Sequence, residues 1–269
     1  MTSTSLPTAS SSAEPGRALR VPLRALGIIA WSAASLGLMA LGLALAWPSP
    51  RARGGWRRVV VRGWGRGLAA ILGLRIEVEG TAPAPPFFLV SNHLSYVDAV
   101  VYAAVAPGRF VAKREVRGWP GIGILAWMAG TIFIDRGAPR DALRVQRHLA
   151  SAYEAGEGVL VFAEATSSEG RRVLPFRPAL LDWAARTGRP VHHASISYRT
   201  PAGAEPAHQS ICWWGDMTFG PHFLGLCRLP SATASVTFGA ASLTGEDRRT
   251  LAAALQRAVA GHFIPVVGD

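Results

Sequence analysis

Residues 88–100 read FLVSNHLSYVDAV, an apolar run followed by the start of a helical pattern. The run FLVS favours a strand buried on both faces, and a helix is expected to begin near Ser95. His93 then lies in a strand-to-helix turn, where reactive side chains are frequent. On one continuous helix, His93 and Asp98 would lie about 140° apart and could not meet. They can meet only if His93 precedes the helix and the chain folds back.

Ser95 and Asp98 give a reason for such a fold-back. The pattern S-x-x-D places Ser95 at the N-cap and Asp98 in the first turn, near the unpaired amide groups of the helix. The same pattern has a purely structural interpretation, in which Asp98 only caps the helix and His93 is a hydrogen-bonded turn residue. The segment by itself does not separate the two interpretations.

Short apolar runs alternate with helical stretches along the rest of the chain from residue 75. Each run is rich in Val, Ile or Phe and is bounded by Gly, Pro or polar residues, as expected of buried strands. The predicted strands lie within residues 75–80, 87–93, 109–113, 131–136, 158–165, 190–198 and 235–240. The predicted helices lie within 95–106, 138–156, 181–188 and 244–262, the last with Thr244 and Asp247 in capping-box positions. This alternation predicts an α/β domain over residues 75–269, with a mostly parallel or mixed sheet flanked by helices.

The N-terminal part of the chain has a different composition. Residues 1–24 begin with a Ser-, Thr- and Pro-rich stretch and predict a disordered basic tail. Residues 25–47 carry no charge and are long enough to form a membrane helix. A cleaved signal peptide is the alternative, although this apolar stretch is longer than usual for one. We therefore predict a membrane anchor over residues 25–74.

Arginines surround the apolar segment unevenly. Three precede it from residue 17 to residue 24, and six follow it from residue 51 to residue 66. This bias predicts that the following domain lies on the cytoplasmic face, in bacteria that of the inner membrane. Within residues 59–74, Arg62 and Arg66 stand one turn apart among apolar residues, which fits either a helix in the membrane interface or a core helix.

The charge of the chain points to an anionic partner. The sequence has 28 basic and 17 acidic residues, and its formal net charge is +11. Because ten arginines and no acidic residue lie between residues 17 and 75, around the apolar segment, a lipid membrane is favoured over nucleic acid. Lys113 is the only lysine, so part of the arginine excess can reflect genome composition. Cys212 and Cys227 are expected to be free, buried thiols of a cytosol-facing domain.

Three further segments extend the pattern around His93. They are GTIFIDRG at 130–137, GVLVFAEATSSEGRRVLPFR at 158–177 and RPVHHASISY at 189–198. Together with NHLSYVDAV, these segments resemble, in order and spacing, the four motif blocks of the lysophospholipid and glycerolphosphate acyltransferase family. The first block, N-H-x4-D, is weak by itself, but the three blocks that follow make the resemblance specific.

The resemblance implies acyl transfer from acyl-CoA or acyl-carrier protein to a lysophospholipid, with no cofactor and no metal. His93 would be the general base on the acceptor hydroxyl, and Asp98 would orient the ring and stabilise the imidazolium. The backbone N–H groups around Ser95 are the predicted stabilisers of the oxyanion. The adjacent His192 and His193 would point to opposite faces of a strand, which argues against joint metal binding.

The resemblance also implies an acceptor site. Arg136 matches the family's acceptor-binding arginine, which would grip a phosphate, and Glu164 belongs to the same site. The predicted further contacts are Thr166, Ser167, Lys113 and Arg177. A surface ion pair is the alternative for Arg136, and solvated charge is the alternative for Lys113 and Arg177.

Two departures from the family pattern concern the acceptor. The third block commonly reads F-P-E-G-T, but here Ala163 and Ala165 replace the proline and the glycine, so the backbone beside Glu164 is expected to lose a left-handed option. The fourth block usually has a second proline where His193 stands. The predicted acceptor is 1-acylglycerol 3-phosphate, giving phosphatidic acid, with lyso-ornithine lipid or another lysolipid as the alternative.

Two other hypotheses remain open. A non-catalytic, membrane-associated lipid-binding relative could keep the same fold, but it would require a broken catalytic pair. The aromatic segment 212–226 fits either packing beneath a long loop or the lining of an acyl-chain groove.

Overall fold

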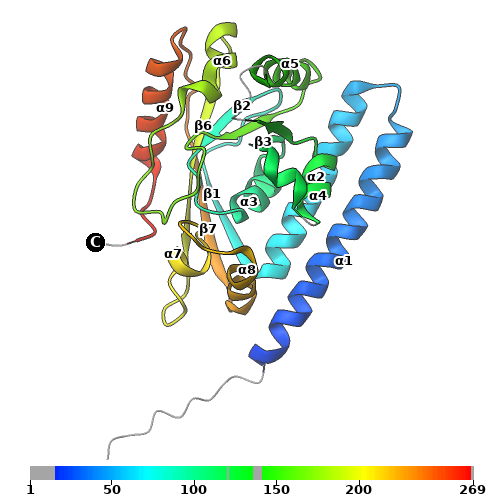
Figure 1. Ribbon diagram of the computed structural model, residues 1–269, viewed down its shortest axis with the longest axis vertical. Helices are drawn as coiled ribbons and strands as arrows, with labels where there is room; N and C mark the ends of the chain where they lie inside the picture. Colours follow the sequence, from blue (N-terminus) through cyan, green and yellow to red (C-terminus); the bar gives the residue numbers. More distant parts are fainter. Residues whose placement is uncertain (1–15, 120, 136–140, 268–269) are drawn as a thin grey trace, which may run out of the picture.

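A computed structural model describes residues 16–119, 121–135 and 141–267 (Figure 1). A twisted sheet stands at the centre, with helices on both of its faces, and a long helical hairpin, α1 and α2, packs on one side. Arg136 and residues 1–15 lie outside the described residues.

The sheet has seven described strands in the order β1-β7-β6-β2-β5-β3-β4. Neighbouring strands run parallel except β6 and β7, which are antiparallel, so the predicted mostly parallel or mixed sheet is confirmed. The strands are β1 (Leu74–Glu79), β2 (Phe88–Ser91), β3 (Arg109–Lys113), β4 (Ile132–Ile134), β5 (Val159–Phe162), β6 (Val191–Arg199) and β7 (Ala232–Phe238).

Each predicted apolar run contains most or all of one strand. β2 is buried along its whole length, because β5 and β6 flank it and helices cover both faces. The carboxyl ends of the parallel strands β2, β5 and β3 meet at one edge of the sheet. His93 and Glu164 follow β2 and β5, and Lys113 ends β3, so the fold brings the first and third motif blocks together at this edge, with Lys113 on the neighbouring strand.

Four helices occupy the segments in which they were predicted: α3 (Val97–Val105), α5 (Asp141–Glu154), α6 (Asp182–Thr187) and α9 (Arg248–His262). The predicted capping box of α9 is wrong, because the helix begins after Asp247 rather than after Thr244. Asp247 is itself the N-cap, and its Oδ1 accepts the Thr250 N–H at 2.8 Å. Several short helices were not predicted: η1 (Arg114–Gly118), α4 (Ile122–Met128), η2 (Pro178–Leu181), α7 (Ala207–Ser210) and α8 (Phe219–Arg228).

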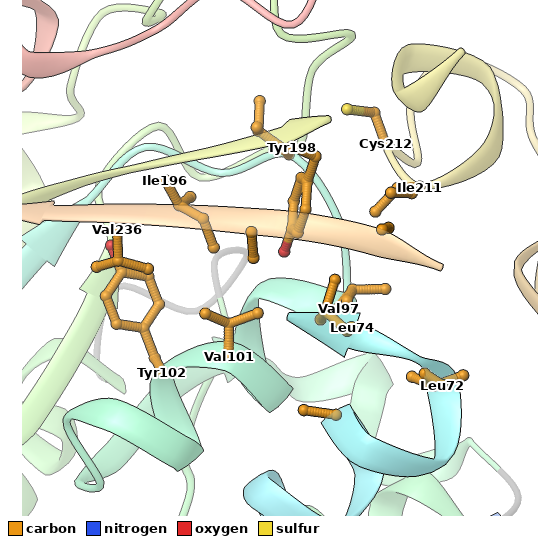
Figure 2. Packing of buried hydrophobic residues seen from close by; sticks show 14 of the residues in the cluster. Leu72, Leu74, Val97, Val101, Tyr102, Ile196, Tyr198, Ile211, Cys212 and Val236 are labelled. Atoms are coloured by element: carbon orange, nitrogen blue, oxygen red, sulfur yellow. The ribbon is translucent and has the colours of Figure 1, made fainter. Parts of the chain in front are cut away.

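Two apolar layers hold the sheet between its helices. On the face of α2 and α3, the close-up in Figure 2 shows Val97 and Val101 of α3 against Ile196 of β6 and Val236 of β7. On the opposite face, α5, α6 and α9 pack on β2 and β5. Both cysteines are buried and free, as predicted.

The N-terminal helix is longer than predicted. α1 spans Gly16–Leu45, so residues 16–24, which were predicted to be part of a disordered tail, are helical. Within α1, Leu19–Leu45 is long and apolar enough to cross a membrane. Close packing joins α1 to α2, since the Trp31 Nε1–H donates to the Trp64 carbonyl at 3.2 Å and the Trp31 ring lies over Gly67.

Helix α2 (Pro50–Leu72) begins at the Ser49 N-cap and ends at Gly73, which has a φ of 70°. One side of α2 packs on α3 so closely that a Cβ on Gly65 would lie 2.6 Å from the Ala104 backbone nitrogen. Arg62 and Arg66 remain exposed. Over residues 59–72 the chain therefore packs one side of a helix on the domain and leaves Arg62 and Arg66 on the outside.

Candidate active site

The turn after β2 is fixed by the side chain of Asn92. Its Nδ2 group donates to the Ile196 carbonyl at 2.9 Å, and its Oδ1 accepts the Ile196 N–H at 2.8 Å. Asn92 is fully buried, so its amide group acts as an extra rung between β2 and β6. This pairing holds the following residue, His93, at the edge of the sheet.

His93 and Asp98 meet as the fold-back requires. His93 Nδ1 lies 2.8 Å from Asp98 Oδ2, and the imidazole ring stacks on Phe162 with a centroid distance of 4.1 Å. Because a carboxylate accepts, Nδ1 carries the proton in the neutral form of the ring, and the lone pair is then on Nε2. Within the described residues, Nε2 has no hydrogen bond. The His93 side chain is 23% exposed, so a substrate can approach the ring.

Four donors hold the fully buried Asp98 carboxylate. Besides His93, the N–H groups of Leu94 and Ser95 donate to Oδ2 at 2.7 and 3.1 Å. The Tyr198 hydroxyl donates to Oδ1 at 2.7 Å. A buried carboxylate is stable only when its oxygens are satisfied in this way. Asp98 is thus a fixed acceptor that orients the imidazole and is more than a helix cap.

The same bonds narrow the choice of N–H groups for the predicted oxyanion site. The Ser95 N–H, and the Leu94 N–H beside it, are occupied by Asp98, and the Val97 N–H donates to Ser95 Oγ at 3.3 Å. These three groups already have acceptors, whereas the Tyr96 N–H has none among the described residues. The sequence pattern could not reveal this, because the carboxylate that caps the turn is the one that orients His93.

Glu164 follows β5, next to the turn of residues 92–96 that carries His93. Its side chain is 2% exposed, and Oε1 accepts the Leu174 N–H at 3.1 Å. Burial, together with the nearby charge of Asp98, raises the pKa of Glu164 from its ordinary value of 4.5 to about 8. Oε2 is buried as well and has no hydrogen-bond partner in the described part of the chain.

Three of the other predicted acceptor residues lie on the surface. Lys113, Thr166 and Arg177 are exposed, and the Arg177 N–H donates to the Ala163 carbonyl at 2.8 Å, beside Glu164. The Ser167 hydroxyl donates to the Trp213 carbonyl, so it is already used. Arg136 lies outside the described residues.

An aromatic cluster packs against the turn of residues 92–96. The Tyr96 ring contacts Trp213, Phe219 and His222, with centroid distances of 5.7, 5.2 and 5.4 Å. The Tyr96 hydroxyl and His222 Nδ1 lie 2.9 Å apart. The segment 212–226 thus supplies packing beside the active site.

Sequence and structure comparisons identify relatives. The family model described as "Acyltransferase" matches residues 75–197. The lyso-ornithine lipid O-acyltransferase of Brucella abortus is 34% identical over 234 residues, which are 79% of this chain and 88% of that protein. The chain belongs to the lysophospholipid acyltransferase family. A second relative of this acyltransferase, the 1-acyl-sn-glycerol-3-phosphate acyltransferase of Neisseria meningitidis, is 34% identical over 159 residues, 56% of this chain and 62% of that protein.

A crystal structure shares the fold of this acyltransferase. The 1-acyl-sn-glycerophosphate acyltransferase of Thermotoga maritima superimposes with a TM-score of 0.62 at 22% identity, covering 90% of this chain and 95% of that one. At this identity the likeness concerns the fold alone.

The alanine beside Glu164 adopts the backbone conformation that was predicted to be lost. Ala165 has a φ of 64°, in the left-handed region, where the family pattern has glycine. For an alanine this conformation costs about 1–2 kcal/mol. The acyltransferase therefore has a left-handed residue at this position of the third block although the glycine is replaced. The alanine makes this conformation strained.

The raised pKa of Glu164 predicts a pH dependence of stability. Between pH 4.5 and about 8, the unfolded chain ionises Glu164 while the folded chain keeps it protonated. The folded state therefore loses up to about 1.4 kcal/mol per pH unit as the pH rises through this window. In Glu164→Gln this loss is absent, and the amide oxygen can still accept the Leu174 N–H. Melting temperatures in detergent micelles at pH 5 and pH 8 should therefore differ more for the wild type than for Glu164→Gln; parallel profiles would contradict the assignment.

Proposed function

We propose that this acyltransferase moves a fatty acyl group from a thioester donor to the free hydroxyl of a lysolipid, with His93 as the general base. The observation that carries the proposal is the His93–Asp98 pair. Its hydrogen bond occupies Nδ1 and leaves Nε2 as an accessible proton acceptor at the sheet edge.

In the proposed reaction, the acceptor oxygen attacks the thioester carbonyl carbon while its proton moves to His93 Nε2. The C–S bond then breaks, and the imidazolium returns the proton to the departing thiolate. Asp98 stabilises the imidazolium without taking a proton. No covalent acyl-enzyme is needed, and the donor is acyl-CoA or acyl-carrier protein.

Two acceptors are supported. Lyso-ornithine lipid is favoured by the match to the Brucella protein, which extends over most of both chains. The 1-acylglycerol 3-phosphate acceptor is supported by the Neisseria relative and by exposed basic residues at the sheet edge, Lys113 and Arg177. We assign Lys113, Arg177 and Thr166 to the acceptor headgroup, together with Arg136 after β4, and we assign Glu164 Oε2 to the inner end of the site.

We further propose that the enzyme works on the cytoplasmic face of a bacterial inner membrane. The apolar helix α1 supports membrane association, and the greater number of arginines after the apolar segment supports the side.

A purified, full-length enzyme with labelled acyl-CoA or acyl-carrier protein, tested on a panel of lysolipids in detergent micelles, distinguishes these acceptors. We expect the label to appear in a diacylated product from at least one of the two named acceptors. A fully acylated lipid without a free hydroxyl is the control and should not react. Reaction of lyso-ornithine lipid alone would make the enzyme an aminolipid acyltransferase, and labelling of no lysolipid would overturn the proposed function.

A further inference from the structure

Helix α4 is a short, uncharged helix on the surface of the catalytic domain. Its sequence is IGILAWM, and no charged residue occurs from residue 118 to residue 134. Ile124 is 58% exposed and Trp127 is 62% exposed. Large apolar side chains that stay exposed to water do not contribute the stabilisation that burial gives. A surface that gathers them is therefore a candidate interaction surface.

The C-terminal end of α4 packs beside the helical hairpin. Met128 and Ala129 contact the apolar cluster formed by Met39 of α1 and Val60 and Val61 of α2. α4 therefore lies beside α1, on the side of the sheet that faces the hairpin (Figure 1). The neighbouring α1 also presents large apolar side chains outward, among them Leu38 and Leu41.

Basic residues flank the apolar face. Lys113, Arg114 and Arg117 are exposed in the segment that leads into α4. Arg114 pairs with Asp135 at 2.8 Å, whereas Lys113 and Arg117 form no ion pair with any described residue. Apolar side chains rimmed by free cations are the composition of a surface that enters the headgroup region of an anionic membrane.

We propose that α4 is a second membrane contact, made by the catalytic domain itself, in which Ile124 and Trp127 enter the interfacial layer of an anionic bilayer. This inference rests on the membrane location proposed above. The uncharged run and its position beside α1 favour a lipid partner over a protein partner.

The contact has a consequence for substrate entry. Trp119, just before α4, contacts Trp213 and Phe219 with centroid distances of 5.5 and 6.3 Å. Both of these rings contact Tyr96 in the turn of residues 92–96. When α4 lies in the membrane interface, these aromatic rings form a continuous apolar surface from the lipid to the turn that carries His93. An acyl chain can move along this surface.

The proposal is tested with a fluorescent probe on the full-length protein. Because both native cysteines are buried, the variants Trp127→Cys, Leu41→Cys and Ile264→Cys can each be labelled selectively with an environment-sensitive dye. Leu41, on α1, and Ile264, after α9, are both 59% exposed, so they match Trp127 in accessibility. The labelled proteins are reconstituted in vesicles of phosphatidylethanolamine and phosphatidylglycerol that carry a lipid-attached quencher. Ile124→Cys gives the same information if Trp127→Cys does not fold.

We expect quenching and a blue shift at positions 41 and 127, and neither at position 264. Quenching at position 41 alone would overturn the role of α4 and leave the membrane location intact. The absence of quenching at both positions 41 and 127 would overturn both. If the dye at position 127 responds to an added acidic carrier protein but not to the quencher in the lipid, the face binds a protein. That result would also overturn the proposal.

Discussion

His93→Ala is expected to lower kcat for acyl transfer by about 10²–10⁴-fold, because the acceptor hydroxyl loses its general base. The side chain is partly exposed and its ring lies on Phe162 at the sheet edge, so its removal should leave the fold in place. The rate is measured with a saturating acyl thioester and the lysolipid that the panel selects, and folding is checked by the melting temperature.

A matched control is His148→Ala, which removes an exposed histidine from α5, on the opposite side of the sheet from α3. This variant should keep the wild-type rate. If His93→Ala also keeps that rate, His93 is not the general base, even if the protein still binds lipid.

The second large effect is expected on the free energy of unfolding, from a buried ion cluster that joins the helical hairpin to the α/β domain. The Glu157 side chain is 7% exposed, and its carboxylate accepts hydrogen bonds from two arginines. Oε2 lies 2.6 Å from Nη1 of Arg57 on α2, and Oε1 lies 2.5 Å from Nη2 of Arg109 on β3. Glu157→Ala leaves two neighbouring guanidinium groups without their counter-charge. Breaking a buried pair in this way lowers the free energy of unfolding by about 3–5 kcal/mol. Chemical denaturation in detergent micelles measures the loss.

The control for this variant is the exposed pair of Glu169 and Arg171, which lie 3.0 Å apart. Glu169→Ala should lower the free energy of unfolding by about 1 kcal/mol or less, because water screens the pair. Since Arg57 lies on α2, proteolysis of α2 should also be faster in Glu157→Ala than in the wild type. Equal destabilisation by the two variants would show that the cluster does not hold the hairpin.

The strands and the catalytic fold-back were predictable because their signals are local. Each strand is a short apolar run with clear boundaries, and the positions of Ser95 and Asp98 required His93 to precede the helix. The helix α4 was missed because a wholly apolar segment of seven residues has no amphipathic period. The cap of α9 was misplaced because Thr244 and Asp247 both suit an N-cap, and the sequence alone does not decide between them.

The supporting contacts of the site depend on residues far apart in the chain. Tyr198 reaches Asp98, and Asn92 reaches Ile196, only because β6 lies beside β2. Glu157 meets its two arginines only once α2, β3 and β5 have assembled. A single sequence does not show which strands are neighbours, so these roles could not be predicted.

The sheet order has a consequence for how such enzymes diverge. After α3 the chain leaves the catalytic edge, forms β3, α4, β4 and α5, and returns as β5 directly beside β2. Residues 106–158 thus form an inserted segment, here called the excursion, whose two ends lie close together. The pairing of β2 with β5 places His93 beside Glu164. Mutations on the outer surface of this excursion can accumulate without moving His93 or Asp98. A lineage can therefore adapt α4 to a different membrane while its chemistry stays the same.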